Sequence, residues 1–321
     1  MQSQIGWHAS HELYAPSRLL RVLHQAERAG FGAASCSDHF HPWSPSSGQS
    51  GFAWSWLGAA LASSRLSVGT VCAPGQRYHP AILAQAVATL LEMDPGRFWL
   101  AVGSGEALNE SITSEPWPDK SVRNARLKEC VEIMRALWRG ETVTHDGLVK
   151  VQQAKLFTRP LETPLVIGAA LSPETAGWMG GWADGLITAG RDHDKIKQVI
   201  NAFREGGGGG KPLYLQAAIS TGKTDEEALM AAHRNWRHAG LELSQLSDLA
   251  TPAAFDVASK TVTPPVIDQR LRCSADRHRH IDWLRGDLEL GFTTVFLHYV
   301  GDGLEEFVET FSQDVLPQVL A

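Results

Sequence analysis

Short apolar runs alternate with longer amphipathic stretches along all 321 residues of the chain. Each short run has the length and residue types of a buried strand, and each is followed by the apolar spacing that indicates a helix. The predicted strands cover residues 5–9, 33–37, 66–71, 98–102, 165–169, 185–188, 213–219 and 294–298. This alternation predicts an α/β fold with a parallel sheet, and the number of units matches a closed (β/α)8 TIM barrel.

Two segments interrupt the alternation. Residues 141–158 read as a β-hairpin that turns at Asp146 and Gly147, inserted before the fifth strand. In residues 241–265 the pattern weakens and prolines occur, which predicts an irregular insertion. No repeat or linker divides the chain, so we expect one domain that covers residues 1–321.

The composition places the chain among ordinary globular proteins. It is 43% hydrophobic and 20% charged, with a net charge of −6. No apolar run has the about 20 residues that span a membrane, and the four cysteines form no Cys-x-x-Cys pair. The mixed stretch 270–280 is expected to be a solvated helix start rather than a nucleic-acid surface. We therefore expect a cytoplasmic protein with no membrane or nucleic-acid partner.

The densest group of reactive side chains follows the second predicted strand. Asp38, His39, His41 and Trp43 all fall within residues 37–43. Function in a TIM barrel lies at the carboxyl ends of the strands, and a histidine there can exchange a proton while an aspartate holds its tautomer. The alternative is that Asp38 caps the loop and His39 is a packing residue.

His39 and His41 also resemble the ligand pair of metal-dependent hydrolase barrels. Such a site needs further ligands from other strands. The fifth and sixth predicted strands end near Ala169 and Ala189 without an imidazole or carboxylate. We predict no metal site, and a metal-dependent hydrolase remains a rival interpretation.

A glycine-rich segment follows the fourth strand. Gly103 and Gly105 would let the backbone approach a flat or phosphorylated ligand, while Glu106 and Asn109 offer an acid and an amide. Leu108 stands where a dinucleotide fingerprint has its third glycine, which disfavours a Rossmann NAD site. A simple turn before a helix is the alternative.

Three other segments leave two interpretations open. Arg77 and Tyr78 either contact a ligand or pair with a carboxylate and pack. Ser172 either begins a phosphate-binding helix or is a plain N-cap. Trp56 is expected in the core, whereas Trp54 could be core or could line a pocket.

The order of these motifs resembles the luciferase-like monooxygenase superfamily. The similarity rests on the segment 6–14, Ser-Asp-His-Phe-x-Pro-Trp at 37–43, Arg-Tyr-x-Pro at 77–80 with Ala-Gln-Ala at 84–86, and Gly-x-Gly-Glu-Ala-Leu-Asn-Glu at 103–110. Within the superfamily the chain is most similar to F420-dependent glucose-6-phosphate dehydrogenases. Residues 51–56 and 72–77 look more like a sister group of flavin-type oxidoreductases that is expected to use FMN.

The resemblance implies an enzyme that binds FMN or F420 across the strand ends and is usually a homodimer. By matching motif, His39 would be the base that accepts a substrate proton, Trp43 would stack near the reacting carbon, and Glu106 and Glu12 would be pocket acids. Asp38 would orient His39 or contact the cofactor.

The same resemblance implies a set of cofactor-binding residues at the ends of several strands. Besides Asp38 and Glu106, they are Val71, Cys72, Ala73, Ser104, Gly105, Asn109, Ala170, Leu171 and Ser172. The bond between Val71 and Cys72 matches a non-prolyl cis peptide of the family.

The chain departs from the sugar-phosphate dehydrogenases at the phosphate clamp. Of three cations, Arg191 and Arg270 fall near equivalent positions, and the third position falls near Leu246. A dianionic phosphate would lose a charge-assisted contact, so glucose 6-phosphate is not the expected substrate. We predict an FMN- or F420-dependent oxidoreductase that transfers a hydride to or from a small organic substrate. A flavin-dependent monooxygenase and a noncatalytic flavin-binding protein are the alternatives.

Overall fold

Eight parallel strands close into a barrel in the computed structural model, which describes residues 3–320. The strand order around the barrel follows the chain, and β9 pairs with both β8 and β11 to close it. The barrel strands are β1 (Gln4–Ala9), β2 (Ala33–Ser37), β3 (Ser67–Cys72), β4 (Phe98–Val102), β7 (Val166–Ala169), β8 (Gly185–Ala189), β9 (Leu213–Ser220) and β11 (Thr294–Tyr299). The predicted (β/α)8 barrel is therefore confirmed, and each strand boundary lies within one residue of its predicted position.

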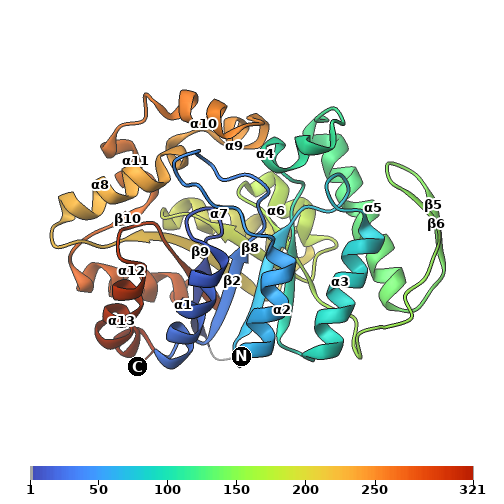
Figure 1. The fold of residues 1–321 in the computed structure, drawn as a ribbon, viewed down its shortest axis with the longest axis horizontal. Coiled ribbons are helices and arrows are strands. Elements are labelled where there is room, and N and C mark those ends of the chain that lie inside the picture. The colour runs from blue at the N-terminus through green and yellow to red at the C-terminus, as the bar shows by residue number, and fades with distance from the viewer. Residues whose placement is uncertain (1–2, 321) are drawn as a thin grey trace.

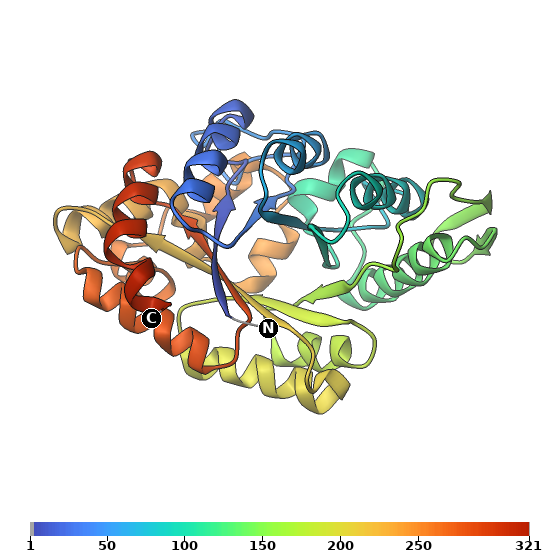
Figure 2. The same cartoon turned by 90° about the horizontal axis from the view of Figure 1, so that it is seen from below.

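Helices cover the outside of the barrel, as Figures 1 and 2 show. They are α1 (Pro16–Arg28), α2 (Ala53–Ser63), α3 (Pro80–Met93), α5 (Lys120–Trp138), α6 (Pro173–Gly180), α7 (His193–Phe203), α8 (Asp225–Trp236), α12 (Arg277–Glu289), α13 (Leu304–Asp314) and α14 (Leu316–Val319). Short helical turns are α4 (Ala107–Glu110), η1 (Ser111–Thr113), η2 (Arg204–Gly208) and η3 (Arg237–Gly240).

Local signals explain where these helices begin and which face they bury. In α1, Pro16 occupies the first turn, where its missing N–H is tolerated. Leu19, Val22, Leu23 and Ala26 recur at helical spacing and are buried against the strands. The sequence of α1 thus sets both its start and the face that it buries.

The barrel interior is filled by side chains. Phe296 of β11 stacks on Trp99 of β4 with ring centroids 5.1 Å apart, and Tyr214 of β9 packs edge-on against Trp99. Gly69 of β3 makes room for this group, because a Cβ at that position would collide with the Trp99 ring. The interior is therefore a packed core, and ligands must bind at the mouth.

The insertion at 241–265 is helical rather than irregular. It contains α9 (Leu243–Asp248), α10 (Pro252–Ser259) and the start of α11 (Pro264–Arg270). Pro252 and Pro264 begin helices, and the Thr251 side chain caps α10. The prolines that suggested irregular backbone are thus helix-start signals.

The stretch 270–280 matches the expected solvated helix start only in part: α12 begins at Arg277, and residues 276–279 are exposed. It contains a further strand, β10 (Arg272–Cys273), which pairs with β9. Arg272 is buried and forms a two-pronged ion pair with Asp287 of α12. The partner of this arginine, Asp287, lies 15 residues away in the sequence, and local composition does not reveal the pair.

The remaining features lie outside the barrel wall. Strands β5 (Val143–Asp146) and β6 (Lys150–Ala154) form an antiparallel hairpin that projects from the barrel (Figure 2). Among residues 3–320 no helix is long and apolar enough to cross a membrane.

The carboxyl ends of the strands share one end of the molecule. In Figure 1 the N-terminus lies at the bottom, and α4, α9, α10 and α11 lie at the top. Helices α4 and α9 contact each other there. The loops after β1, β2, β3 and β4 meet beneath them, which is where the candidate residues gather.

Candidate active site at the barrel mouth

An amide fixes the ring of His39 in the loop after β2. The Asn109 Oδ1 atom accepts a hydrogen bond of 2.9 Å from the backbone N–H of Phe40, which turns the amide nitrogen toward His39. Asn109 Nδ2 then lies 3.2 Å from His39 Nδ1. Because an amide nitrogen only donates, His39 Nδ1 accepts, and a neutral ring carries its proton on Nε2.

Two carboxylates face that nitrogen. His39 Nε2 lies 3.6 Å from Glu12 Oε1 and 3.8 Å from Glu106 Oε2. Glu12 stands in the turn after β1, and Glu106 stands directly before α4. We call Glu12, His39 and Glu106 the rim cluster, and it joins the ends of three strands.

Glu12 is the buried acid of the rim cluster. Its side chain is 3% exposed and accepts hydrogen bonds from the hydroxyls of Ser10 and Ser37. Burial alone would raise the pKa of Glu12, but the attraction of His39 and the Ser37 hydrogen bond outweigh it and lower the pKa. Glu12 therefore holds a negative charge beside the imidazole.

Glu106 is the accessible acid of the rim cluster. Its side chain is 36% exposed, yet the protein packed around the carboxyl group raises its pKa, and repulsion from Glu12 and Glu110 adds to that rise. The two carboxyl groups that face the same imidazole nitrogen thus have pKa values shifted in opposite directions. Such a pair is a candidate for acid–base chemistry.

Asp38 pairs with Arg77 and Tyr78 rather than orienting His39, which was one of the two roles that its motif implied. Its carboxylate accepts hydrogen bonds from Tyr78 Oη at 2.8 Å and from Arg77 Nη2 at 3.2 Å. Arg77 also lies 3.3 Å from Glu110 and donates to the Asp38 carbonyl. Asp38 makes no hydrogen bond to His39, so Asn109, not Asp38, orients the ring. Of the two interpretations left open for Arg77 and Tyr78, the structure shows the one in which they pair with a carboxylate and pack.

Trp43 forms part of an aromatic wall beside His39. The two ring centroids are 4.9 Å apart, and the other face of Trp43 stacks on His238 at 4.5 Å. Trp236 and Phe255 pack edge-on against Trp43. The indole is buried, so it supports the His39 ring and offers at most an edge to a ligand.

Small residues line the neighbouring strand ends where the family similarity places the cofactor. Gly105 has a φ of 85°, and a Cβ there would come within 3.2 Å of the Ala73 side chain. A Cβ at Gly103 would meet only Ala169, at 3.7 Å. Leu171 is exposed, whereas Ala170 is buried and Ser172 caps α6. Residues 103–106 are half-buried, and Ser104 offers a hydroxyl beside Glu106.

The Val71–Cys72 peptide differs from the family expectation. No peptide bond between residues 3 and 320 is cis. Strand β3 continues in regular register through Cys72, which pairs with Val102, and the Cys72 carbonyl accepts from Gly103. Val71 is half-buried next to the barrel-interior cluster.

The two arginines predicted to bind substrate make other contacts. Arg191 lies 3.4 Å from Asp268 and donates to the Leu271 carbonyl at 3.1 Å. Arg270 pairs with Glu242 at an exposed position on α11. Neither side chain contacts a member of the rim cluster.

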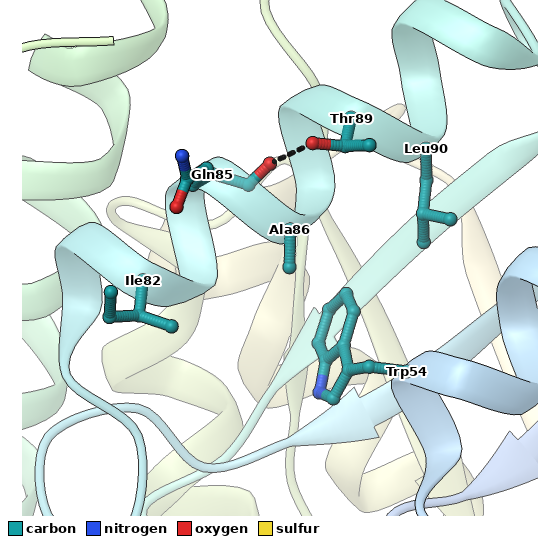
Figure 3. A pocket seen from close by; sticks show the side chains of 6 residues that line it. All are labelled: Trp54, Ile82, Gln85, Ala86, Thr89 and Leu90. Carbon is teal, nitrogen blue, oxygen red and sulfur yellow. Dashed lines mark hydrogen bonds between the residues drawn. The ribbon is translucent and has the colours of Figure 1, made fainter.

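A groove elsewhere on the surface has no link to these groups. It measures about 290 Å³ and is lined by Trp54 of α2 and by residues of α3, among them Ile82 and Gln85 (Figure 3). Trp54 therefore lines a groove on the outside of the barrel, while Trp56 is buried in the core as predicted. Within residues 3–320, no group of His, Cys, Asp and Glu side chains has the arrangement of a metal site.

Sequence reasoning missed two features of the mouth. Ser10 and Ser37 hold Glu12, and only their closeness in sequence to Glu12 and His39 could have suggested this. His8 and His298 lie ring to ring although they are far apart in the chain. Each lies near the end of an apolar strand run, but sequence spacing does not show that the two strands are neighbours.

The family model for luciferase-like monooxygenases matches residues 2–298. The chain is 34% identical to an F420-dependent glucose-6-phosphate dehydrogenase of Intrasporangium calvum, over 98% of each chain. It is also 34% identical to the enzyme of the same name from Beutenbergia cavernae, over 99% of this chain and 98% of that one.

Solved structures agree with this placement. An F420-dependent secondary alcohol dehydrogenase in complex with an F420–acetone adduct is 30% identical, with a TM-score of 0.92 over 99% of both chains. The FMN-bound oxygenating constituent of 3,6-diketocamphane monooxygenase from Pseudomonas putida is 16% identical, with a TM-score of 0.72 over 99% of both chains. The latter similarity describes the fold alone.

Proposed function

Because the chain belongs to the luciferase-like monooxygenase family, we propose that it is an oxidoreductase that transfers a hydride between coenzyme F420 and a small uncharged alcohol or ketone. The observation that carries the proposal is the rim cluster, in which one imidazole nitrogen lies within 4 Å of two carboxylates. Their pKa values are shifted in opposite directions, which suits one acid to accept a proton while the other stays ionised.

F420-dependent relatives and an FMN-bound structural neighbour support F420 or FMN as the cofactor. We favour F420 because the F420-dependent proteins are 30–34% identical, whereas the FMN-bound neighbour is similar in fold alone. Residues 103–106 and 170–172, with Ala73, would hold the ring. The bound cofactor supplies the hydride chemistry, and the protein supplies orientation and charge.

The residues of the rim cluster carry out the proton transfer. Asn109 leaves the proton of a neutral His39 on Nε2, so this nitrogen donates a hydrogen bond to a substrate oxygen placed between it and the carboxylates. Glu106 takes up the proton that an alcohol oxygen loses, because its raised pKa makes it the stronger base of the two acids. In ketone reduction the same groups return a proton. This assignment gives Glu106 the role of proton acceptor that family similarity gave to His39.

Charge at the mouth favours an uncharged substrate over a sugar phosphate. Arg77 is held between Asp38 and Glu110, while Arg191 pairs with Asp268. Glu12 and Glu106 would repel a phosphate. These contacts support the proposal that glucose 6-phosphate is not the substrate, although two relatives bear its name.

Titration of the purified protein with F420 and with FMN, followed by fluorescence, tests the cofactor. We expect micromolar binding of F420 and much weaker binding of FMN. The F420-loaded protein is then mixed with 2-propanol or with glucose 6-phosphate while the cofactor absorbance is followed. Loss of absorbance with 2-propanol alone supports the proposal. Binding of both cofactors weaker than millimolar, or turnover of glucose 6-phosphate alone, contradicts it.

A further inference from the structure

Two histidines lie ring to ring at the ends of neighbouring strands. His8 of β1 and His298 of β11 have ring centroids 4.6 Å apart, and both are buried. His8 Nδ1 lies 2.8 Å from the Ser35 hydroxyl, and His298 Nδ1 lies 3.2 Å from Gln216 Nε2. Each ring is thus held through one nitrogen. We call His8 and His298 the histidine pair.

The other nitrogen of each ring has no partner. His8 Nε2 and His298 Nε2 are both buried without a hydrogen bond among the described residues. Because Gln216 donates to His298 Nδ1, a neutral His298 carries its proton on Nε2, which makes this atom a donor without an acceptor. Buried polar groups are nearly always paired, so this arrangement calls for an oxygen that the protein itself does not provide.

The histidine pair is uncharged. Burial, followed by repulsion from its partner His298, places the pKa of His8 well below the ordinary value. Burial likewise lowers the pKa of His298 to about 3. Neutral rings next to the negative Glu12 attract no anion, so the missing oxygen belongs to an uncharged group.

An unbroken series of rings joins the histidine pair to the rim cluster. From His39 it passes through Trp43, His238 and Trp236 to His298 and His8, with successive centroids 4.9, 4.5, 4.4, 4.5 and 4.6 Å apart. The negative charge of Glu12 acts on His8, which places the histidine pair and the rim cluster in one electrostatic environment. His11 also has an unpaired Nε2, but its ring packs against Trp56 and takes no part in this series.

We propose that the histidine pair is a neutral hydrogen-bonding subsite for a second oxygen of the substrate, opposite the oxygen that reacts at the rim cluster. The inference rests on the proposed function and narrows its substrate class to compounds with a further hydroxyl or carbonyl group. His298 donates to that oxygen through the Nε2 proton that has no acceptor in the protein.

The test uses the F420-loaded enzyme with 2-heptanol and 1,6-heptanediol, which differ by one hydroxyl at the far end of the carbon chain. We expect kcat/KM to favour the diol by about three- to tenfold, the range of one net hydrogen bond. In His8→Phe and His298→Phe, which keep an aromatic ring in the wall, the ratio of the two kcat/KM values falls to about one. His280→Phe is the matched control, because His280 is also buried with an unpaired ring nitrogen but packs on Trp283 and Phe311. It keeps the wild-type ratio.

A second measurement does not depend on turnover. In protein labelled with 15N-histidine, the diol shifts the Nε2 signals of the histidine pair and 2-heptanol does not. Equal shifts with both alcohols, or the wild-type ratio in both variants, would mean that the pair holds only water, and would overturn the inference. If the protein binds no F420, the proposed function fails, and the 15N signals of the cofactor-free protein still decide whether the pair binds the diol.

Discussion

Two clusters of charged side chains stand side by side at the barrel mouth and behave differently. In one, Arg77 bridges Asp38 and Glu110, and none of the three side chains is more than 8% exposed. In the other, His39 lies beyond hydrogen-bond distance from both Glu12 and Glu106, and Glu106 opens to solvent. The same residue types thus build a supporting network and a reactive one. The difference lies in how completely each charge is paired.

The largest change in stability is expected when the cluster of Arg77, Asp38 and Glu110 loses its arginine. Arg77→Met leaves two buried carboxylates without a counter-charge and should lower the free energy of unfolding by about 3–5 kcal/mol. Urea unfolding measures this. Arg135→Met is the matched control, since Arg135 pairs with Asp184 at a half-exposed position and should cost about 1 kcal/mol or less. Equal losses in the two variants would refute the contrast between the networks.

The smallest effect is expected at Arg270, which family similarity placed at the substrate. Its pair with Glu242 is exposed, so Arg270→Gln should change the free energy of unfolding by less than about 0.5 kcal/mol. The same variant should leave the KM for 2-propanol unchanged. A several-fold rise in that KM would show that Arg270 contacts the substrate and would contradict this prediction.

Much of this architecture was predictable because the signals are local and repeated. The eight strands were found from their apolar runs, and the barrel rule then placed His39, Glu12 and Glu106 at one rim. The segment 241–265 was misjudged because its helices are short, although Thr251 and Pro252 mark a helix start. Short helices bury too few residues to produce a clear periodicity.

The partners of the charged residues could not be predicted. Asp38 and His39 are adjacent in sequence, which suggested a hydrogen-bonded pair, but Asp38 binds Arg77 and Tyr78 from the next strand end. Likewise, His8 and His298 meet only because β11 closes the barrel against β1. Contacts of this kind depend on the register between distant strands, which composition and spacing do not encode.

The most direct test of the account is the pH dependence of F420 reduction by 2-propanol in single-turnover experiments with wild type and Glu106→Gln. Glu106 must be ionised to accept the proton, and its raised pKa means that the wild-type rate climbs with pH above the usual glutamate range. Below that range the carboxyl group is protonated and the rate falls.

In Glu106→Gln the rate should fall by about 10²–10³-fold, and this rise with pH should disappear. Glu115→Gln, at an exposed glutamate in the loop after α4, should match the wild type throughout. A Glu106→Gln protein with the wild-type rate and pH profile would contradict the assignment of proton transfer to the rim cluster.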